Sequence, residues 1–328
     1  MNASVNDTRS VRPRTLEESM YATIAYFDLF DYPLTPQELW TYLFYPPAGC
    51  TISEMLEKSK THSELEWSQG FIHAKGRGCC VQERIGRYLH TERKVRKALR
   101  FARLASLVPG VAMIALCNTL ALSHARDSSD IDVFIVARKG YLWFVRAACI
   151  VLSLFFGPRL SEQHMRDALC LSFFIRRDAC DLSPCALNPS CGIDDVYLSL
   201  WVSRCVPMYD EGGQAQAFWE ANRWTENSIP HRIPYIPNHM RSIHPNGVLR
   251  AVKKILTIIL FPFQARIERT CAMIQKKRFP ERIRRAASSA GSGVVITDQI
   301  LKFHLNDRRE YFQQALIERL RSCRISQV

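Results

Sequence analysis

The sequence predicts an α+β fold in which a sheet-containing unit lies between two helical regions. Short apolar runs suited to buried strands are concentrated between residues 111 and 175, and apolar residues at helical spacing dominate the chain on either side. With 328 residues, 47% of them hydrophobic, the chain can fill the cores of two or three domains. We expect a disordered tail at residues 1–14 before the first helix.

The N-terminal region begins with the pattern of three helices. Apolar residues recur at helical spacing from Thr15 to about Leu29, with acids in the first turn, where the helix dipole favours them. Thr35 and Pro36 then supply an N-cap and a first helical residue for a second helix. A weaker helical pattern follows from Ser53.

Two short extended runs follow these helices. Residues 70–75 and 79–83 are joined across Gly76, Arg77 and Gly78, which predicts a β-hairpin. Three helices followed by a hairpin are typical of a winged helix, so we expect a winged-helix-like domain at 15–92.

A strongly basic segment comes next, and its apolar residues form a stripe along one amphipathic helix. The charges are then expected on the opposite face, either as an ordinary solvated surface or as a phosphate-binding face beside the wing. The basic residues are Arg84, Arg87, Arg93, Lys94, Arg96, Lys97, Arg100 and Arg103.

The central unit reads as strand, turn, short helix and strand. Residues 111–117 and 130–136 are the strands, and Asn118 with Thr119 forms the turn between the first strand and a short helical piece. A helix at about 140–156 and a third strand at 169–175 complete an α/β unit. Beyond Leu182 the chain reads mostly as helix, with a proline-rich connection at 230–245.

Asp130 and Asp132 stand one residue apart at the start of the second strand. Alternate residues of a strand share a face, so both carboxylates point the same way while Ile131 and Val133 enter the core. Two close carboxylates repel each other unless a cation lies between them, and Mg²⁺ prefers oxygen ligands. The alternative is a turn cap at Asp130 and a solvated strand residue at Asp132.

These residues resemble the signature of the DNA polymerase beta type nucleotidyltransferase superfamily. That signature is a strand, Gly-Ser opening a short helix, and Asp-x-Asp on the next strand, with ten residues between the Ser and the first Asp; ten separate Thr119 from Asp130. The resemblance implies a mixed sheet with helices, a core at 93–185, and Mg²⁺ or Mn²⁺ held by Asp130 and Asp132 as catalytic residues. Nucleotide-binding residues would be Asn118, Thr119 and Ser129.

The chain departs from this signature in three places, one of which is Ser123, where a second glycine is frequent. Asn118-Thr119 replaces Gly-Ser, yet Asn tolerates a left-handed backbone and Thr keeps a hydroxyl for a phosphate. The third carboxylate that many relatives carry on the next strand is missing from 169–175, and Asp178 and Asp181 follow just beyond it. The chain also resembles uncharacterised bacterial proteins that combine a winged-helix-like region, this domain and a helical tail, here at 186–328.

The amino-acid composition favours some classes of binding partner over others. A net charge of +13 favours polyanions, so we expect a nucleoside triphosphate as substrate and consider nucleic acid as a partner of the basic N-terminal half. The polar N-terminus lacks a signal peptide, the twelve cysteines are scattered, and no apolar stretch reaches the ~20 residues of a bilayer crossing. We therefore expect reduced thiols and a cytoplasmic protein without a transmembrane segment. Cys180, Cys185 and Cys191 lack the spacing of a zinc site.

The sequence thus predicts a metal-dependent nucleotidyltransferase that transfers a nucleoside monophosphate to a hydroxyl acceptor. The main alternative is a non-catalytic regulator that binds nucleic acid and carries a decayed transferase domain. A toxin–antitoxin type modifier of a partner protein is a third. The nucleotide, the acceptor and the oligomeric state do not follow from the sequence.

Overall fold

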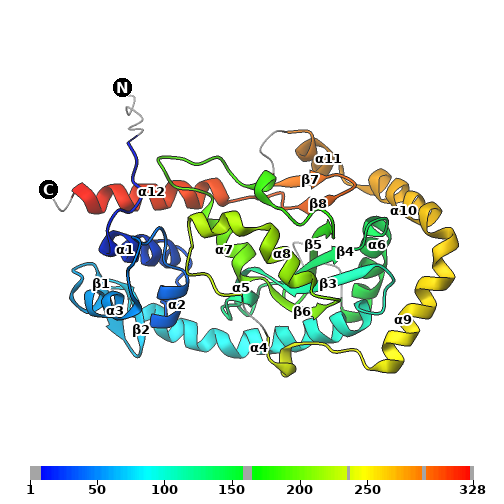
Figure 1. Cartoon of the computed structure of the whole chain (residues 1–328), viewed down its shortest axis with the longest axis horizontal. Coiled ribbons are helices and arrows are strands. Elements are labelled where there is room, and N and C mark those ends of the chain that lie inside the picture. The colour runs from blue at the N-terminus through cyan, green and yellow to red at the C-terminus, as the bar shows by residue number, and fades with distance from the viewer. Residues whose placement is uncertain (1–8, 158–164, 235–236, 290–292, 326–328) are drawn as a thin grey trace.

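A computed structural model of the chain describes residues 9–157, 165–234, 237–289 and 293–325. It has a mixed α+β architecture, with helices on both sides of a central sheet (Figure 1). No helix among these residues is long and apolar enough to cross a membrane. The twelve cysteines are all free thiols.

The central sheet has six strands in the order β6-β3-β4-β5-β8-β7. Only β4 and β5 run parallel, and every other neighbouring pair is antiparallel. Three of the strands lie in the C-terminal region that the sequence predicts to be mostly helical, so that prediction missed half of the sheet. The strands are β3 (Val111–Leu116), β4 (Ile131–Ala137), β5 (Leu169–Arg176), β6 (Val206–Asp210), β7 (Val294–Ile296) and β8 (Ile300–Phe303).

Helices cover both faces of this sheet because both faces of its central strands are apolar. Ile131, Val133 and Ile135 of β4 belong to a core shared with α4 (Cys79–Ala105) and α6 (Leu142–Ser153). Phe134 and Val136 belong to a second core, on the opposite face, with α7 (Val196–Arg204) and α8 (Gln214–Ala221). Asp132 alternates with Ile131 and Val133, so it lies on the α7 side.

The N-terminal region holds the three predicted helices, α1 (Leu16–Asp28), α2 (Pro36–Thr41) and α3 (Ile52–Thr61). Thr15 caps α1, and Thr35 with Glu38 forms a capping box at α2, as the sequence indicates. The hairpin prediction was wrong in position: its strands are β1 (Leu65–Ser68) and β2 (Phe71–Ala74). The turn is Gln69-Gly70, where both residues have positive φ, as two-residue hairpin loops require.

Residues 79–83, predicted as the second strand of the hairpin, form the first turn of α4 instead. This helix continues through the expected boundary at residues 92 and 93 and connects the N-terminal helices to the sheet (Figure 1). The tail prediction was wrong for residues 9–14, because Val11 is buried and its N–H donates to the Cys191 carbonyl. Residues 1–8 lie outside the described part of the chain.

The remaining helices lie towards the C-terminus. α10 (Gln264–Arg278) and α11 (Glu281–Ala287) supply residues to the core beneath α6, whereas α9 (Gly247–Leu260) lies along the outer edge of the molecule (Figure 1). The final helix, α12 (Arg309–Ile325), returns to the N-terminal region and shares a core with α1 and α7. The two ends of the described chain therefore pack in the same region.

Candidate metal centre

The connection between β3 and β4 has the predicted form of a tight turn and a short helix. Asn118 opens α5 (Asn118–Ala121) with φ +53°, in the left-handed region that Asn tolerates best among non-glycine residues. Ser123 closes the same loop with φ +55°. The Thr119 carbonyl accepts the His124 N–H, which fixes the end of α5. The left-handed turn expected at Asn118 is confirmed.

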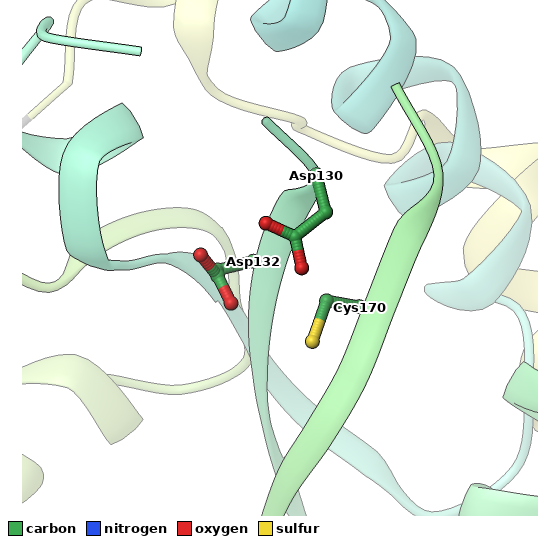
Figure 2. Close-up of side chains that lie close together, drawn as sticks. All are labelled: Asp130, Asp132 and Cys170. Carbon is green, nitrogen blue, oxygen red and sulfur yellow. The ribbon is translucent and has the colours of Figure 1, made fainter. Parts of the chain in front are cut away.

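Asp130, Asp132 and Cys170 converge beside this loop (Figure 2). One ligand atom from each, two carboxylate oxygens and the Cys170 Sγ, lies within 4.8 Å of the others. Asp132 pairs in register with Cys170 across the parallel strands β4 and β5, and Asp130 immediately precedes β4. Among the described residues this is the one group of three or more His, Cys, Asp or Glu side chains suited to a metal ion.

The electrostatics of this group favour a cation. Burial and the neighbouring Asp130 carboxylate raise the pKa of Asp132 to about 7, opposed by a hydrogen bond from the Asn118 side chain. Burial also raises the pKa of Asp130, and burial with the nearby carboxylates raises that of the Cys170 thiol well above its ordinary value. Neither carboxylate has an ion-pair partner in the described part of the chain. A divalent cation would relieve this repulsion.

Cys170 is the residue that the sequence reasoning missed. It lies on the adjacent strand, where a third carboxylate was expected, and nothing in the sequence around it indicates a metal ligand. Asp178 follows the other end of β5, where Arg177 bonds to Ala137 at the far end of β4, so it cannot complete the group. Its carboxylate instead pairs with Arg176. Asp181 lies further along the chain, and its carboxylate accepts a hydrogen bond from the Ser183 N–H.

The loop before β4 is held by the basic helix α4. Lys94 is fully buried, and its Nζ donates to the carbonyls of Asp127 and Ser129, at 3.0 and 2.6 Å, and to the Asp167 carboxylate at 2.6 Å. Arg93 pairs with the carboxylates of Asp127 and Asp167. These contacts position the backbone that carries Asp130.

The prediction that the basic residues of α4 share one outer face was therefore wrong for several of them. Arg84 and Arg87 are buried like Lys94, and they pair with Glu38 and Glu83. The exposed basic residues of this helix are Arg93, Arg96, Arg100 and Arg103.

The other predicted nucleotide-binding residues differ in their surroundings. Thr119 is exposed and lines a cavity, so its hydroxyl is accessible. The Ser129 hydroxyl donates to the Arg126 carbonyl at 2.9 Å, within its own loop. The structure thus brings Asn118 and the two acids together. Thr119 follows Asn118 and faces the cavity, and the Ser129 hydroxyl is hydrogen-bonded within its own turn.

Two cavities meet at Asn118, Tyr197 and Trp201, which line both of them. The first is largely aromatic and lies against the N-terminal helices; Phe27, Phe30 and Trp201 are among its lining residues. The second is basic and includes Lys302, His304 and Arg308. The Tyr197 ring lies near Asp132, whose charge adds to burial in raising the pKa of the phenol. Neither acid lines these cavities, and Asn118, whose side chain hydrogen-bonds to Asp132, connects them to the acid pair.

A short line of contacts joins the acids to the basic cavity. The Cys170 thiol lies 3.3 Å from the Ser172 hydroxyl, which in turn lies 3.4 Å from Nε2 of His304 at the end of β8. Burial and the nearby Lys302 lower the pKa of His304 to about 4, so this imidazole is neutral at neutral pH.

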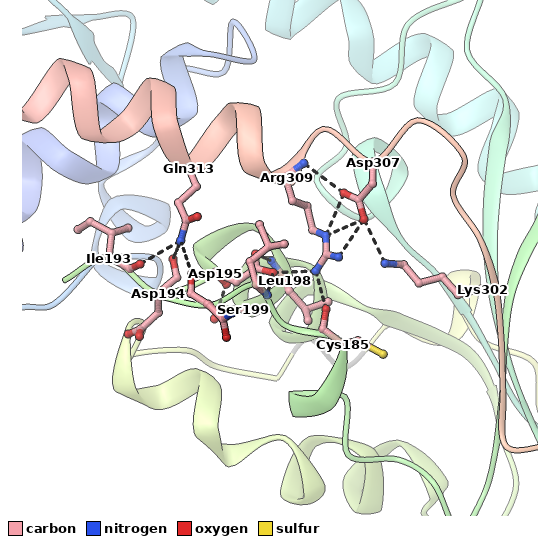
Figure 3. A network of polar contacts seen from close by, with 12 residues as sticks. Cys185, Ile193, Asp194, Asp195, Leu198, Ser199, Lys302, Asp307, Arg309 and Gln313 are labelled. Carbon is pink, nitrogen blue, oxygen red and sulfur yellow. Dashed lines mark hydrogen bonds and ion pairs between the residues drawn. The ribbon is translucent and has the colours of Figure 1, made fainter. Parts of the chain in front are cut away.

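Arg309 does not face the basic cavity as a free cation. Its guanidinium pairs with Asp195 at 2.7 Å and with Asp307 at 2.9 Å, and it also bonds to the Cys185 carbonyl (Figure 3). Asp195 is the N-cap of α7, so this network holds the start of α7 against α12. Arg309 is therefore already paired with two carboxylates and is not free to bind a phosphate. Arg308 is exposed.

Comparison of the chain with protein-family models, with curated proteins and with solved structures finds no match. The geometry of the chain's own residues is therefore the basis on which a function can be assigned.

Proposed function

We propose that the protein is a metal-dependent nucleotidyltransferase that transfers a nucleoside monophosphate from a nucleoside triphosphate to a hydroxyl acceptor. The observation that carries the proposal is the convergence of Asp130, Asp132 and Cys170 on adjacent strands, directly behind the left-handed turn at Asn118. This is the arrangement that the resemblance to the DNA polymerase beta type superfamily implies, with a thiol in place of the third carboxylate.

The donor set fits a divalent metal. Asp130 and Asp132 would hold Mg²⁺ or Mn²⁺, since both ions prefer carboxylate oxygens. Burial raises the pKa of both acids, Lys94 only opposes this shift at Asp130, and a bound cation would stabilise both charged forms. When bound, such an ion neutralises phosphate charge and aligns the reacting oxygens. Asn118 orients Asp132 through its side-chain amide.

The two cavities suit the two parts of a nucleotide. The basic cavity offers the exposed Arg308 to phosphates, whereas Lys302 is buried and paired with Asp307, and the aromatic cavity offers flat apolar surfaces to a base. Thr119 lines the aromatic cavity next to Asn118. Its hydroxyl and the backbone at the start of α5 can therefore contact a phosphate that lies between the aromatic and the basic cavity. With its pKa lowered to about 4, His304 stays neutral in this cavity, where its ring can take part in hydrogen bonds but not act as a base at neutral pH.

The main alternative is a nucleic-acid-binding regulator whose transferase site is inactive. The specific observation in its favour is Cys170, because a protonated thiol is a poorer ligand for Mg²⁺ than a carboxylate. The three N-terminal helices with their hairpin fit a winged-helix-like domain, and Arg96, Arg100 and Arg103 remain exposed further along α4, where that helix packs on the central sheet. These cations would bind the phosphates of a nucleic acid without distinguishing between its bases.

Incubation of the purified protein with nucleoside triphosphates labelled at the α-phosphate, Mg²⁺ or Mn²⁺, and cell extract tests the proposal. Transfer of label to an acceptor, lost in the Asp130→Asn/Asp132→Asn variant, is the expected result. Absence of transfer with every nucleotide and both metals would contradict it. Salt-sensitive retention of DNA or RNA by a protein without transfer activity would support the regulator instead.

A further inference from the structure

Helix α9 is attached to the molecule by its polar face. Lys253 is buried, and its Nζ donates to the Val111 carbonyl at 2.7 Å, to the Tyr209 hydroxyl at 2.9 Å and to Glu211 at 3.1 Å. Arg250, Lys253 and Thr257 follow one another at helical spacing, so they share this face. They line a cleft of about 580 Å³ between α9 and the end of β6.

The apolar face of α9 points away from the molecule. Val248, Val252, Ile255 and Ile259 follow one another at helical spacing on the side opposite Lys253, and all four are exposed. Ile259 is 59% exposed and Phe261, just after the helix, is 72% exposed. An amphipathic helix normally packs its apolar side on the core, so this orientation leaves a large apolar surface in water. Figure 1 shows α9 at the outer, right-hand edge of the fold, away from the central sheet.

The charge of this segment is strongly positive. Between Gly247 and Ser289 the only acids are Glu268 and Glu281, and both are engaged, by the N–H groups of Trp143 and Phe144 and by Arg285. The segment holds eleven basic residues, and all except Lys253 are exposed. They are Arg250, Lys253, Lys254, Arg266, Arg269, Lys276, Lys277, Arg278, Arg282, Arg284 and Arg285.

We infer that α9 and the following Phe261 and Phe263 lie in the surface of an anionic lipid bilayer, with the apolar face among the acyl chains and the flanking lysines and arginines at the headgroups. An exposed apolar helix face flanked by cations matches the chemistry of such an interface. Nucleic acid would complement the charges but not the isoleucines, and a folded protein partner would not require so many cations. This inference does not depend on the transferase proposal.

Flotation of the full-length protein with vesicles tests the inference. The protein should float with vesicles of phosphatidylcholine and phosphatidylglycerol, and much less with phosphatidylcholine alone. Ile255→Glu with Ile259→Glu should abolish flotation, whereas Leu89→Glu with Met240→Glu, at residues 79% and 82% exposed elsewhere, should leave it unchanged. Lys254→Gln should weaken binding about fivefold, the effect of one cation near an anionic surface.

Three results would overturn the inference. The first is no flotation of the parent protein with anionic vesicles. The second is equal flotation of the parent and the Ile255→Glu/Ile259→Glu variant. The third is a parent that forms a dimer by light scattering, does not float, and becomes monomeric in that variant, because α9 would then bind a second copy of the chain. Thermal melting of each variant checks that its fold is kept.

Discussion

Asp132 of β4 lies directly opposite Cys170 of β5 in the parallel pairing of these two strands. The pairing places a thiol within 4.8 Å of two carboxylates that have no cationic partner among the described residues. The proposed magnesium site would thus have two carboxylate donors, and residue 170 is the position where a third carboxylate would lie.

Replacing Cys170 with Asp should strengthen metal binding, because a carboxylate is a better ligand for Mg²⁺ than a protonated thiol. We expect Mg²⁺ affinity to rise by about tenfold, or about 1.4 kcal/mol. Isothermal calorimetry with the metal alone measures it. Cys170→Ser is the matched control and should change the affinity little; an unchanged affinity in Cys170→Asp would show that residue 170 does not face the ion.

Asn118→Val should destabilise the fold, since a β-branched side chain is strained at φ +53°. The expected loss in the free energy of unfolding is about 1–3 kcal/mol. Asn118→Gly removes the same amide but accepts this backbone, so it should melt close to the parent. Equal melting temperatures for the Val and Gly variants would be inconsistent with a left-handed turn.

Lys94→Met should destabilise the protein much more than a change at the exposed Arg96 of the same helix. The substitution leaves the Asp167 carboxylate and two carbonyls without their buried partner, at a cost of about 3–5 kcal/mol. Arg96→Gln should cost no more than about 0.5 kcal/mol. Urea denaturation compares the two, and similar midpoints would mean that Lys94 is not a structural tether.

His304 should make the protein less stable in acid. Its folded pKa of about 4 lies below the ordinary value of 6.5, so between these values the unfolded chain binds more protons and stability rises with pH. Full stability is present above about pH 6.5 and falls by up to about 1.4 kcal/mol per unit as the pH drops towards 4. His304→Gln should flatten this slope in urea denaturation from pH 7 to pH 4.5; an identical slope would mean that His304 is not protonated differently on unfolding.

The central strands and the turn at Asn118 were predictable because their signals are local. The apolar run at 111–116, the polar turn at Asn118 and the spacing of Asp130 and Asp132 each depend on neighbouring residues, and the structure has the corresponding strands and turn. The left-handed backbone conformation of Asn118 could also be predicted, since Asn is one of the few non-glycine residues that tolerate it.

The rest depends on partners that are distant in sequence. β6, β7 and β8 are only three to five residues long. β6 and β8 are strands because they pair with β3 and β5, which are distant in sequence, and β7 in turn pairs with β8. Lys94 looks like any surface lysine until the loop at Asp127 and the residue Asp167 close around it. Residues 79–83 have β-branched and cysteine character, yet the helix of α4 extends through them after Gly78.

The central claim is that Asp130 and Asp132 bind a nucleoside triphosphate through a divalent cation. Calorimetric titration of each nucleoside triphosphate, with and without Mg²⁺ or Mn²⁺, tests it in the parent and in Asp130→Asn/Asp132→Asn, whose melting curve shows that it is folded. We expect the metal to strengthen binding of at least one nucleotide by about tenfold or more in the parent, or about 1.4 kcal/mol, and to have no effect in the variant. Equally tight, metal-dependent binding by the variant would contradict the claim and place the site elsewhere.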